Sequence, residues 1–350
     1  MSSLISLILG LVIFSFFINS VLTVPFIDLI YRIRMVRRRE SEGGGQEKSL
    51  FDKLHDKKAG TPIGGGILII LSVSIIFALI LPLMRRTGVF IHSSFEFSSE
   101  LLVMYFTFVS FGILGLLDDV VKIFGKPKPG KLGAVFGLSK RVKFGLQWVL
   151  AFIDAFLIYK LLGIQIIHIP VLEIILNIGV FYIPFAAFVI VFFANAFNIT
   201  DGLDGLSSGL LIIYLFAYMT IAAGSLDTPL FVFMALWMGS LIAFLYFNIW
   251  PARIWLGDAG ALSFGAMIAV IGLIIGNVAV LFVIGGIFVL EAASSAIQIF
   301  GWKILKRRIF PIAPLHHAFE AIGWEEPKIV MRAWIAGIML AVFGLWLATI

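Results

Sequence analysis

The sequence predicts an all-α polytopic integral membrane protein, and its composition is the first reason. Of the 350 residues, 61% are hydrophobic and 13% are charged, and the mean hydropathy is +1.09. A soluble domain carries roughly 25% charged residues, so this chain lacks the polar side chains that would cover a soluble enzyme. The apolar residues come in blocks of about 20, the length of a membrane-spanning helix, and not in the alternating segments of about 10 typical of a barrel.

The blocks predict ten transmembrane helices in a single domain that covers residues 1–350. They are expected near residues 5–30, 63–84, 101–118, 144–163, 174–194, 207–224, 229–247, 259–276, 279–303 and 331–350. The first block is expected to be retained, because no basic residue precedes Arg32 and a cleaved signal peptide begins with a basic region. Residues 40–50 contain three consecutive glycines among polar residues, which predicts a flexible cytoplasmic loop.

The distribution of basic residues predicts the orientation of these helices. Short cytoplasmic loops hold most Lys and Arg residues of a membrane protein. The loops on one side hold 23 of the 26 basic residues, and the other side holds only Arg85, Arg86 and Lys160. Both termini are therefore expected outside and five polar loops in the cytoplasm. The formal net charge of +6 belongs to this asymmetry, so it does not indicate a nucleic-acid partner. With no cysteine in the chain, a disulfide framework and a thiolate site are both excluded.

Acidic residues gather at the cytoplasmic helix ends, where an unpaired carboxylate marks a site or a pathway. Asp118 and Asp119 end the third predicted span, and two adjacent carboxylates repel unless a cation lies between them or one is protonated. Lys122, four residues after Asp118, is expected on the same helical face. A plain solvated helix end is the alternative interpretation, and it is common for one Asp but less so for a pair.

A second polar cluster follows the fifth predicted span. It comprises Asn195, Asn198, Asp201 and Asp204, with Gly202 and Gly205 between them. Glycine lets the backbone leave the helix and approach a ligand. The segment 195–206 has no Lys or Arg, so its carboxylates need a partner from elsewhere, either a divalent metal or a cationic side chain. Two Asp-Gly steps in an ordinary turn are the alternative.

The third and fourth clusters lie in the last two cytoplasmic loops. Asn248, Trp255 and Asp258 precede the eighth span, and Asp258 suits magnesium, which takes one or two carboxylates together with substrate phosphates. Trp255 could stack on a base, although a tryptophan of the membrane interface is the commoner explanation. His316 and His317 are adjacent, a spacing that favours phosphate contact or proton transfer over a zinc site.

Carboxylates, lysines and histidines at one membrane face are the groups that phosphoryl transfer uses. The chain has no Walker motif, so an ATP-driven pump is not indicated. A site at the boundary of water and lipid suits one soluble and one lipid substrate.

The motifs resemble those of the polyprenyl-phosphate N-acetylhexosamine-1-phosphate transferases. The matching stretches are KAGTPIGGG (58–66), LLDDVVK (116–122), NAFNITDGLDGL (195–206), NIWPARIWLGDAGALSFG (248–265), the Glu-Ser-Gln face at 291–298 and PLHHAFEAIGW (314–324). They run in family order through almost the whole chain. The last stretch is similar to the branch that uses a muramoyl-pentapeptide donor, which usually has three consecutive histidines where this chain has Ala318 third.

This resemblance implies transfer of phospho-MurNAc-pentapeptide from UDP-MurNAc-pentapeptide to undecaprenyl phosphate, with lipid I and UMP as products, in peptidoglycan synthesis at the inner (plasma) membrane. It implies Mg²⁺ as cofactor and a homodimer. Carried over by position, Asp258 would bind the metal, and Asp118 and Asp119 would lie near the metal or the lipid phosphate. The nucleotide end would contact Asn195, Asn198, Asp201 and Asp204, with Asn248 and Trp255 beside the uridine. The diphosphate or sugar would contact His316 and His317, and Lys58, Thr61 and Lys122 would neutralise phosphates.

Two other functions fit parts of the sequence. A UDP-GlcNAc polyprenyl-phosphate transferase shares the Asp motifs and differs in the donor. The loop that contains His316 is therefore the feature that distinguishes it from an enzyme with a muramoyl donor. A secondary transporter would use the acids as ion relays, but transporters commonly carry inverted repeats and sites at the bilayer midplane. Here the acids lie at one face and the two halves show no repeat.

Overall fold

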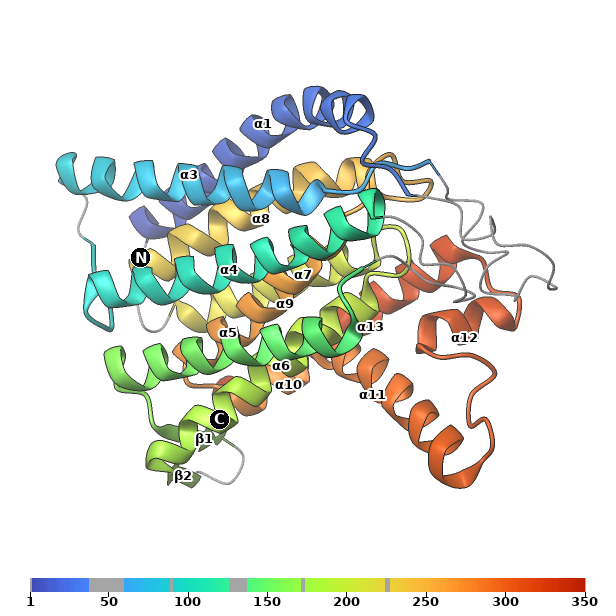
Figure 1. Ribbon diagram of the computed structural model, residues 1–350. Helices are drawn as coiled ribbons and strands as arrows, with labels where there is room; N and C mark the ends of the chain where they lie inside the picture. The colour runs from blue at the N-terminus through green and yellow to red at the C-terminus, as the bar shows by residue number, and fades with distance from the viewer. Residues whose placement is uncertain are drawn as a thin grey trace.

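The computed structural model describes residues 2–37, 60–88, 91–125, 137–170, 174–223 and 227–349, and it shows a helical bundle with one short hairpin (Figure 1). The helices are α1 (Ser2–Arg32), α3 (Gly65–Arg86), α4 (Phe97–Phe124), α5 (Lys140–Leu161), α6 (Tyr182–Thr200), α7 (Leu206–Ala222), α8 (Thr228–Asn248), α9 (Gly257–Ile274), α10 (Val278–Ile284), α11 (Gly286–Phe300), α12 (Leu315–Ala321) and α13 (Glu326–Thr349). Strands β1 (Ile166–Ile169) and β2 (Ile174–Asn177) pair antiparallel. The predicted loop at 40–50 lies outside the described residues.

The predicted fold class is confirmed. In the described part of the chain, nine helices are long and apolar enough to cross a membrane, and α7 is a shorter apolar helix of 17 residues. These ten correspond in order to the ten predicted spans. The chain is therefore a multi-pass membrane protein.

Two predicted boundaries are wrong. The span predicted at 174–194 begins with strand β2, and its helix starts only at Tyr182. Strand β2 begins with three consecutive aliphatic residues, and a short apolar run of this kind does not distinguish a strand from the start of a helix. The span predicted at 279–303 is not continuous, because α10 ends at Ile284 and α11 begins after Gly285. A π-helical segment (Gly301–Leu305) then continues α11.

The centre of the bundle is formed by α8 and α9, which are buried on nearly all sides. A helix that is apolar all round is suited to such a place. A core of buried aromatic rings joins them, with Trp237 packed edge-on against Phe108 and Phe264 at 5.4 and 5.1 Å between ring centroids. The central position of α9 places its N-terminus, and with it Asp258, in the middle of one end of the bundle.

Close approach of α4 to α9 depends on a glycine. A Cβ atom added at Gly115 would lie 2.1 Å from the backbone oxygen of Asp258, so no larger residue fits there without a shift. Three and four residues further along α4, Asp118 and Asp119 are thereby brought against the first turn of α9. In Figure 1 the C-terminal end of α4, helix α12 and the N-terminal end of α13 lie at the same end of the molecule.

Candidate active site

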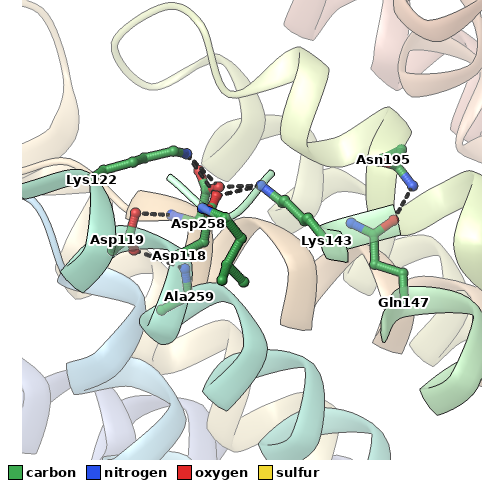
Figure 2. Close-up of polar contacts among 9 residues, drawn as sticks. Asp118, Asp119, Lys122, Lys143, Gln147, Asn195, Asp258 and Ala259 are labelled. Atoms are coloured by element: carbon green, nitrogen blue, oxygen red, sulfur yellow. Dashed lines mark hydrogen bonds and ion pairs between the residues drawn. The ribbon is translucent and has the colours of Figure 1, made fainter. Parts of the chain in front are cut away.

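Two carboxylates and two ammonium groups form the centre of the site (Figure 2). Lys122 Nζ lies 2.6 Å from Asp258 Oδ2 and 2.9 Å from Asp118 Oδ2. Lys143 Nζ lies 2.9 Å from Asp118 Oδ2 and also pairs with Asp258 Oδ2. Asp118 is 1% exposed, and its other oxygen accepts a hydrogen bond from the backbone N–H of Leu138. Each carboxylate therefore contacts both cations, and the predicted common face of Asp118 and Lys122 is confirmed.

Asp119 has a different set of partners from its neighbour. Its two oxygens accept hydrogen bonds from the backbone N–H groups of Asp258 and Ala259, at 3.1 and 3.0 Å. These groups belong to the first turn of α9, where N–H donors have no partner within the helix and the helix dipole favours an anion. Asp119 thus fixes the start of α9, and through it the position of Asp258.

The carboxylates suit a magnesium ion that is completed by substrate oxygens. Asp118 and Asp258 direct oxygens at the same two ammonium groups, so two anionic side chains converge on one place that binds cations. Within the described ranges, no group of three or more His, Asp or Glu side chains forms a metal cage. Magnesium in proteins commonly has one or two carboxylate ligands and takes the rest from phosphates and water, so these residues fit it.

The loop between α6 and α7 forms the second part of the site. Asp201 accepts a hydrogen bond from the Ser207 hydroxyl at 2.5 Å, and Asp204 Oδ2 accepts one from the backbone N–H of Ala252 at 2.9 Å. Gly205 has a φ of 79°, a left-handed conformation that favours glycine. A small pocket is lined by Asp201, Gly202, Leu203, Asp204, Asn248, Trp255 and Leu256. The sequence predicted most of these residues as one binding region, and the structure brings them together.

Asn248 connects this loop to the following one. Its oxygen accepts hydrogen bonds from the Gly205 N–H and the Ser208 hydroxyl, and its nitrogen donates to the Ile254 carbonyl at 3.0 Å. With these bonds, a side chain that is only 4% exposed holds both walls of the pocket. In this structure Asn248 therefore positions the pocket.

Burial raises the pKa of Asp201 to about 7, and the nearby carboxylates of Asp258, Asp119 and Asp204 add to the rise. The hydrogen bond from Ser207 acts in the opposite direction. A carboxyl group with such a pKa changes its charge near neutral pH, which is typical of functional sites.

The histidines approach the pocket from α12. His316 is 1% exposed, its Nδ1 lies 3.0 Å from Glu291 Oε2, and its Nε2 has no hydrogen-bond partner among the residues that the structure describes. A Cβ atom at Gly202 would lie 2.4 Å from that Nε2, so the imidazole packs directly on the glycine of the α6–α7 loop. His317 Nδ1 lies 2.6 Å from Glu320 Oε2, and burial lowers the pKa of His317.

The remaining predicted residues lie around this centre. Asn195 of α6 donates a hydrogen bond at 2.7 Å to Gln147, which lies one turn after Lys143 on α5 (Figure 2). Asn198 is half-buried on α6. Thr61 is also half-buried, and the strand-like segment after it contacts Trp255. The Trp255 ring lies 4.7 Å from the guanidinium of Arg37, a cation–π contact. Lys58 lies outside the described residues.

Two residues that the structure places at the site are not among the site residues predicted from the sequence. Lys143 is the first: it is one of three basic residues at the start of α5, and nothing in the spacing distinguishes it from Lys140 or Arg141. Glu326 is the second, since its carboxylate accepts a 2.6 Å hydrogen bond from the Asp204 backbone N–H across 122 residues of chain. Both contacts join distant segments, so no local signal in the sequence identifies them.

Comparison with known proteins gives one family over most of the chain. The family described as glycosyl transferase family 4 matches residues 101–276. Three curated relatives are named phospho-N-acetylmuramoyl-pentapeptide-transferase. The protein of Anoxybacillus flavithermus is 32% identical over 95% of both chains, that of Bacillus licheniformis 34% over 97%, and that of Bacillus subtilis 32% over 97%.

Proposed function

The chain belongs to the phospho-N-acetylmuramoyl-pentapeptide transferases, within glycosyl transferase family 4, and from this membership we propose the reaction that it carries out. It transfers phospho-MurNAc-pentapeptide from UDP-MurNAc-pentapeptide to undecaprenyl phosphate and releases UMP, a step of peptidoglycan synthesis. The PLHHAFEAIGW stretch at 314–324 supports the muramoyl donor over UDP-GlcNAc.

The pair Asp118 and Asp258 with its two bridging lysines is the observation that carries this proposal. Phosphoryl transfer needs positive charge around phosphate oxygens and fixed positions for the attacking and leaving groups. Lys122 and Lys143 supply that charge, and each is held between two carboxylates before substrate arrives. Such pre-organisation lowers the reorganisation needed during the reaction.

We propose Mg²⁺ as the cofactor, held by Asp258 and Asp118, where it would neutralise phosphate charge. Asp119 acts through α9 in this proposal, because both of its oxygens bind backbone N–H groups of that helix. The pocket lined by Asp201, Asp204, Asn248 and Trp255 would take the nucleotide end. His316 Nε2, to which no described residue donates or accepts a hydrogen bond, would contact the diphosphate or sugar.

The lipid phosphate is proposed to attack the donor directly. A phosphate monoester is ionised near neutral pH, so it needs positioning more than deprotonation. The P–O bond to the lipid phosphate oxygen forms as the P–O bond to UMP breaks, and UMP leaves as an anion. Isolation of a phospho-sugar adduct on Asp118, Asp119 or Asp258 would replace this route by a two-step one.

The active site is proposed to face the cytoplasm across the plasma (inner) membrane. Lys122, Lys143, Arg253 and Lys328 lie in or beside the segments at the site's end of the bundle, and cytoplasmic loops hold most basic residues. The donor is a water-soluble nucleotide and the acceptor a lipid, which suits a site at this boundary. A homodimer is also proposed, by resemblance to the family.

The test uses purified protein in lipid nanodiscs with undecaprenyl phosphate and Mg²⁺. UMP release is followed with UDP-MurNAc-pentapeptide and separately with UDP-GlcNAc, and the D258N variant serves as the inactive control. Metal-dependent turnover of the muramoyl donor alone is the expected result. Turnover of UDP-GlcNAc alone would show that the chain with Ala318 uses a different donor. Absence of UMP release with both donors would refute the proposed transferase activity.

A further inference from the structure

A cavity of about 350 Å³ opens between α3 and α4, at the end of the bundle remote from the active site. Its walls are Phe77, Ala78 and Leu81 of α3 and Phe97, Leu101 and Tyr105 of α4. The volume falls within the range of roughly 300–1,000 Å³ found for small-ligand sites. We call it the α3–α4 groove.

Aromatic side chains form part of the wall of the groove. The Tyr105 hydroxyl donates a hydrogen bond to the Ser74 carbonyl at 2.9 Å, and the ring centroids of Tyr105 and Phe77 lie 5.5 Å apart. Phe77 in turn packs edge-on against Phe233 of the bundle core. The polar atom of Tyr105 is thus satisfied by the backbone, which leaves an apolar lining.

A single charged side chain, Arg85, lies among the described residues that line the groove. It belongs to the last turn of α3, it is exposed, and it forms no ion pair with any residue that the structure describes. A cation at a helix C-terminus is favoured by the helix dipole, but the dipole does not explain an apolar cavity beside it. By the topology that the sequence predicts, Arg85 is also one of three basic residues on this side of the membrane, against 23 on the other.

The apolar α3–α4 groove, with the guanidinium of Arg85 beside it, matches the chemistry of a lipid with an anionic headgroup. Arginine binds phosphate with several N–H donors, and an acyl chain fills an apolar cavity that water fills poorly. We propose that the α3–α4 groove binds one acyl chain of an anionic membrane phospholipid, whose phosphate is held by Arg85. This inference does not depend on the transfer reaction at the opposite end.

The test is native mass spectrometry of the purified chain from nanodiscs that contain equal parts phosphatidylglycerol and phosphatidylcholine. Two variants alter the groove: R85Q removes the charge, and A78W fills the cavity from an exposed wall position. Two matched controls lie beside them on α3 and outside the lining: R86Q, and L79W at a 67% exposed position. Thermal midpoints in detergent verify that all four variants fold.

R85Q is expected to weaken retention of phosphatidylglycerol roughly tenfold, the size expected for one charge-assisted contact, and to leave phosphatidylcholine unchanged. A78W is expected to remove one bound lipid of either class, and both controls are expected to behave as wild type.

Equal lipid retention in A78W and L79W would overturn the proposal. An equal loss in R86Q and R85Q would also overturn it, because the effect would then be general surface charge. If a groove variant changes the fraction of dimer but not the amount of bound lipid, the proposal is overturned, and the groove instead contacts a second copy of the chain. UMP release is measured on the same samples, so failure of the lipid site and failure of the proposed transferase are seen separately.

Discussion

The two parts of the site hold their carboxylates by different means. Where α4, α5 and α9 meet, Asp118 and Asp258 contact the ammonium groups of Lys122 and Lys143. At the α6–α7 loop, a hydroxyl contacts Asp201 and a backbone N–H contacts Asp204. Ion pairs in a partly enclosed site carry charge that can be redistributed when phosphates arrive, whereas neutral hydrogen bonds fix shape. The difference suggests that the first part acts on the reacting phosphates and the second holds the donor in place.

The largest effect is expected from D258N. The amide keeps the size of the side chain but loses the charge that pairs with both lysines, so turnover should fall by about 10²–10³. The measurement is UMP release in nanodiscs at saturating substrate. The control is D154N, a buried carboxyl that accepts a hydrogen bond from the Thr107 hydroxyl, since an amide oxygen accepts the same bond. Full activity of D258N would show that the ion pairs of Asp258 with Lys122 and Lys143 are not needed for the reaction.

Lys143 should be the most important basic residue that sequence reasoning did not single out. K143Q removes the cation shared by Asp118 and Asp258, and turnover should fall by roughly 10–10². K140Q, an exposed lysine one turn earlier on the same helix, is the matched control and should stay near wild type. If the two variants lose activity equally, the geometry around Lys143 has no special role.

A smaller effect is expected at the contact between the α6–α7 loop and helix α12. In G202A the added Cβ would lie 2.4 Å from His316 Nε2, so the imidazole must move. We expect stability to fall by about 1–3 kcal/mol, as for other overpacked positions, and activity to fall with it. G145A on α5 has open space around its Cβ and should not destabilise the protein. Thermal unfolding and UMP release are measured for G202A and G145A. If G202A is as stable and as active as the wild type, the loop adapts to the added Cβ and the expectation is wrong.

The smallest effect concerns pH. Asp201 has a pKa of about 7 in the folded protein, against 3.8 ordinarily. Between these values the folded state binds more protons than the unfolded state, so stability falls as pH rises from about 4 to about 7. Because Asp201 is only half-buried, solvent reduces the effect to about 1–2 kcal/mol. In D201N the thermal midpoint should depend less on pH between about 4 and 7 than in the wild type. An unchanged dependence would show that Asp201 is not the titrating group.

Sequence reasoning reached the fold class and most of the site for one physical reason. Helices that cross a bilayer need apolar blocks of fixed length, and acidic residues at the ends of such blocks are rare enough to indicate function. It failed where the signal was short or shared. Strand β2 is apolar like the beginning of a span, and the break at Gly285 is a single glycine in an apolar run.

The sequence by itself determined the membrane-spanning helices, the end of the bundle that carries the charge, and the family. Each of these depends on composition or on motifs within about 20 residues. Only the tertiary structure decided that Asp118 joins Asp258 through two lysines while Asp119 fixes the start of α9, although the two aspartates are neighbours in the chain. Adjacent residues on a helix point about 100° apart, so the helices packed around α4 assign each carboxylate its partners.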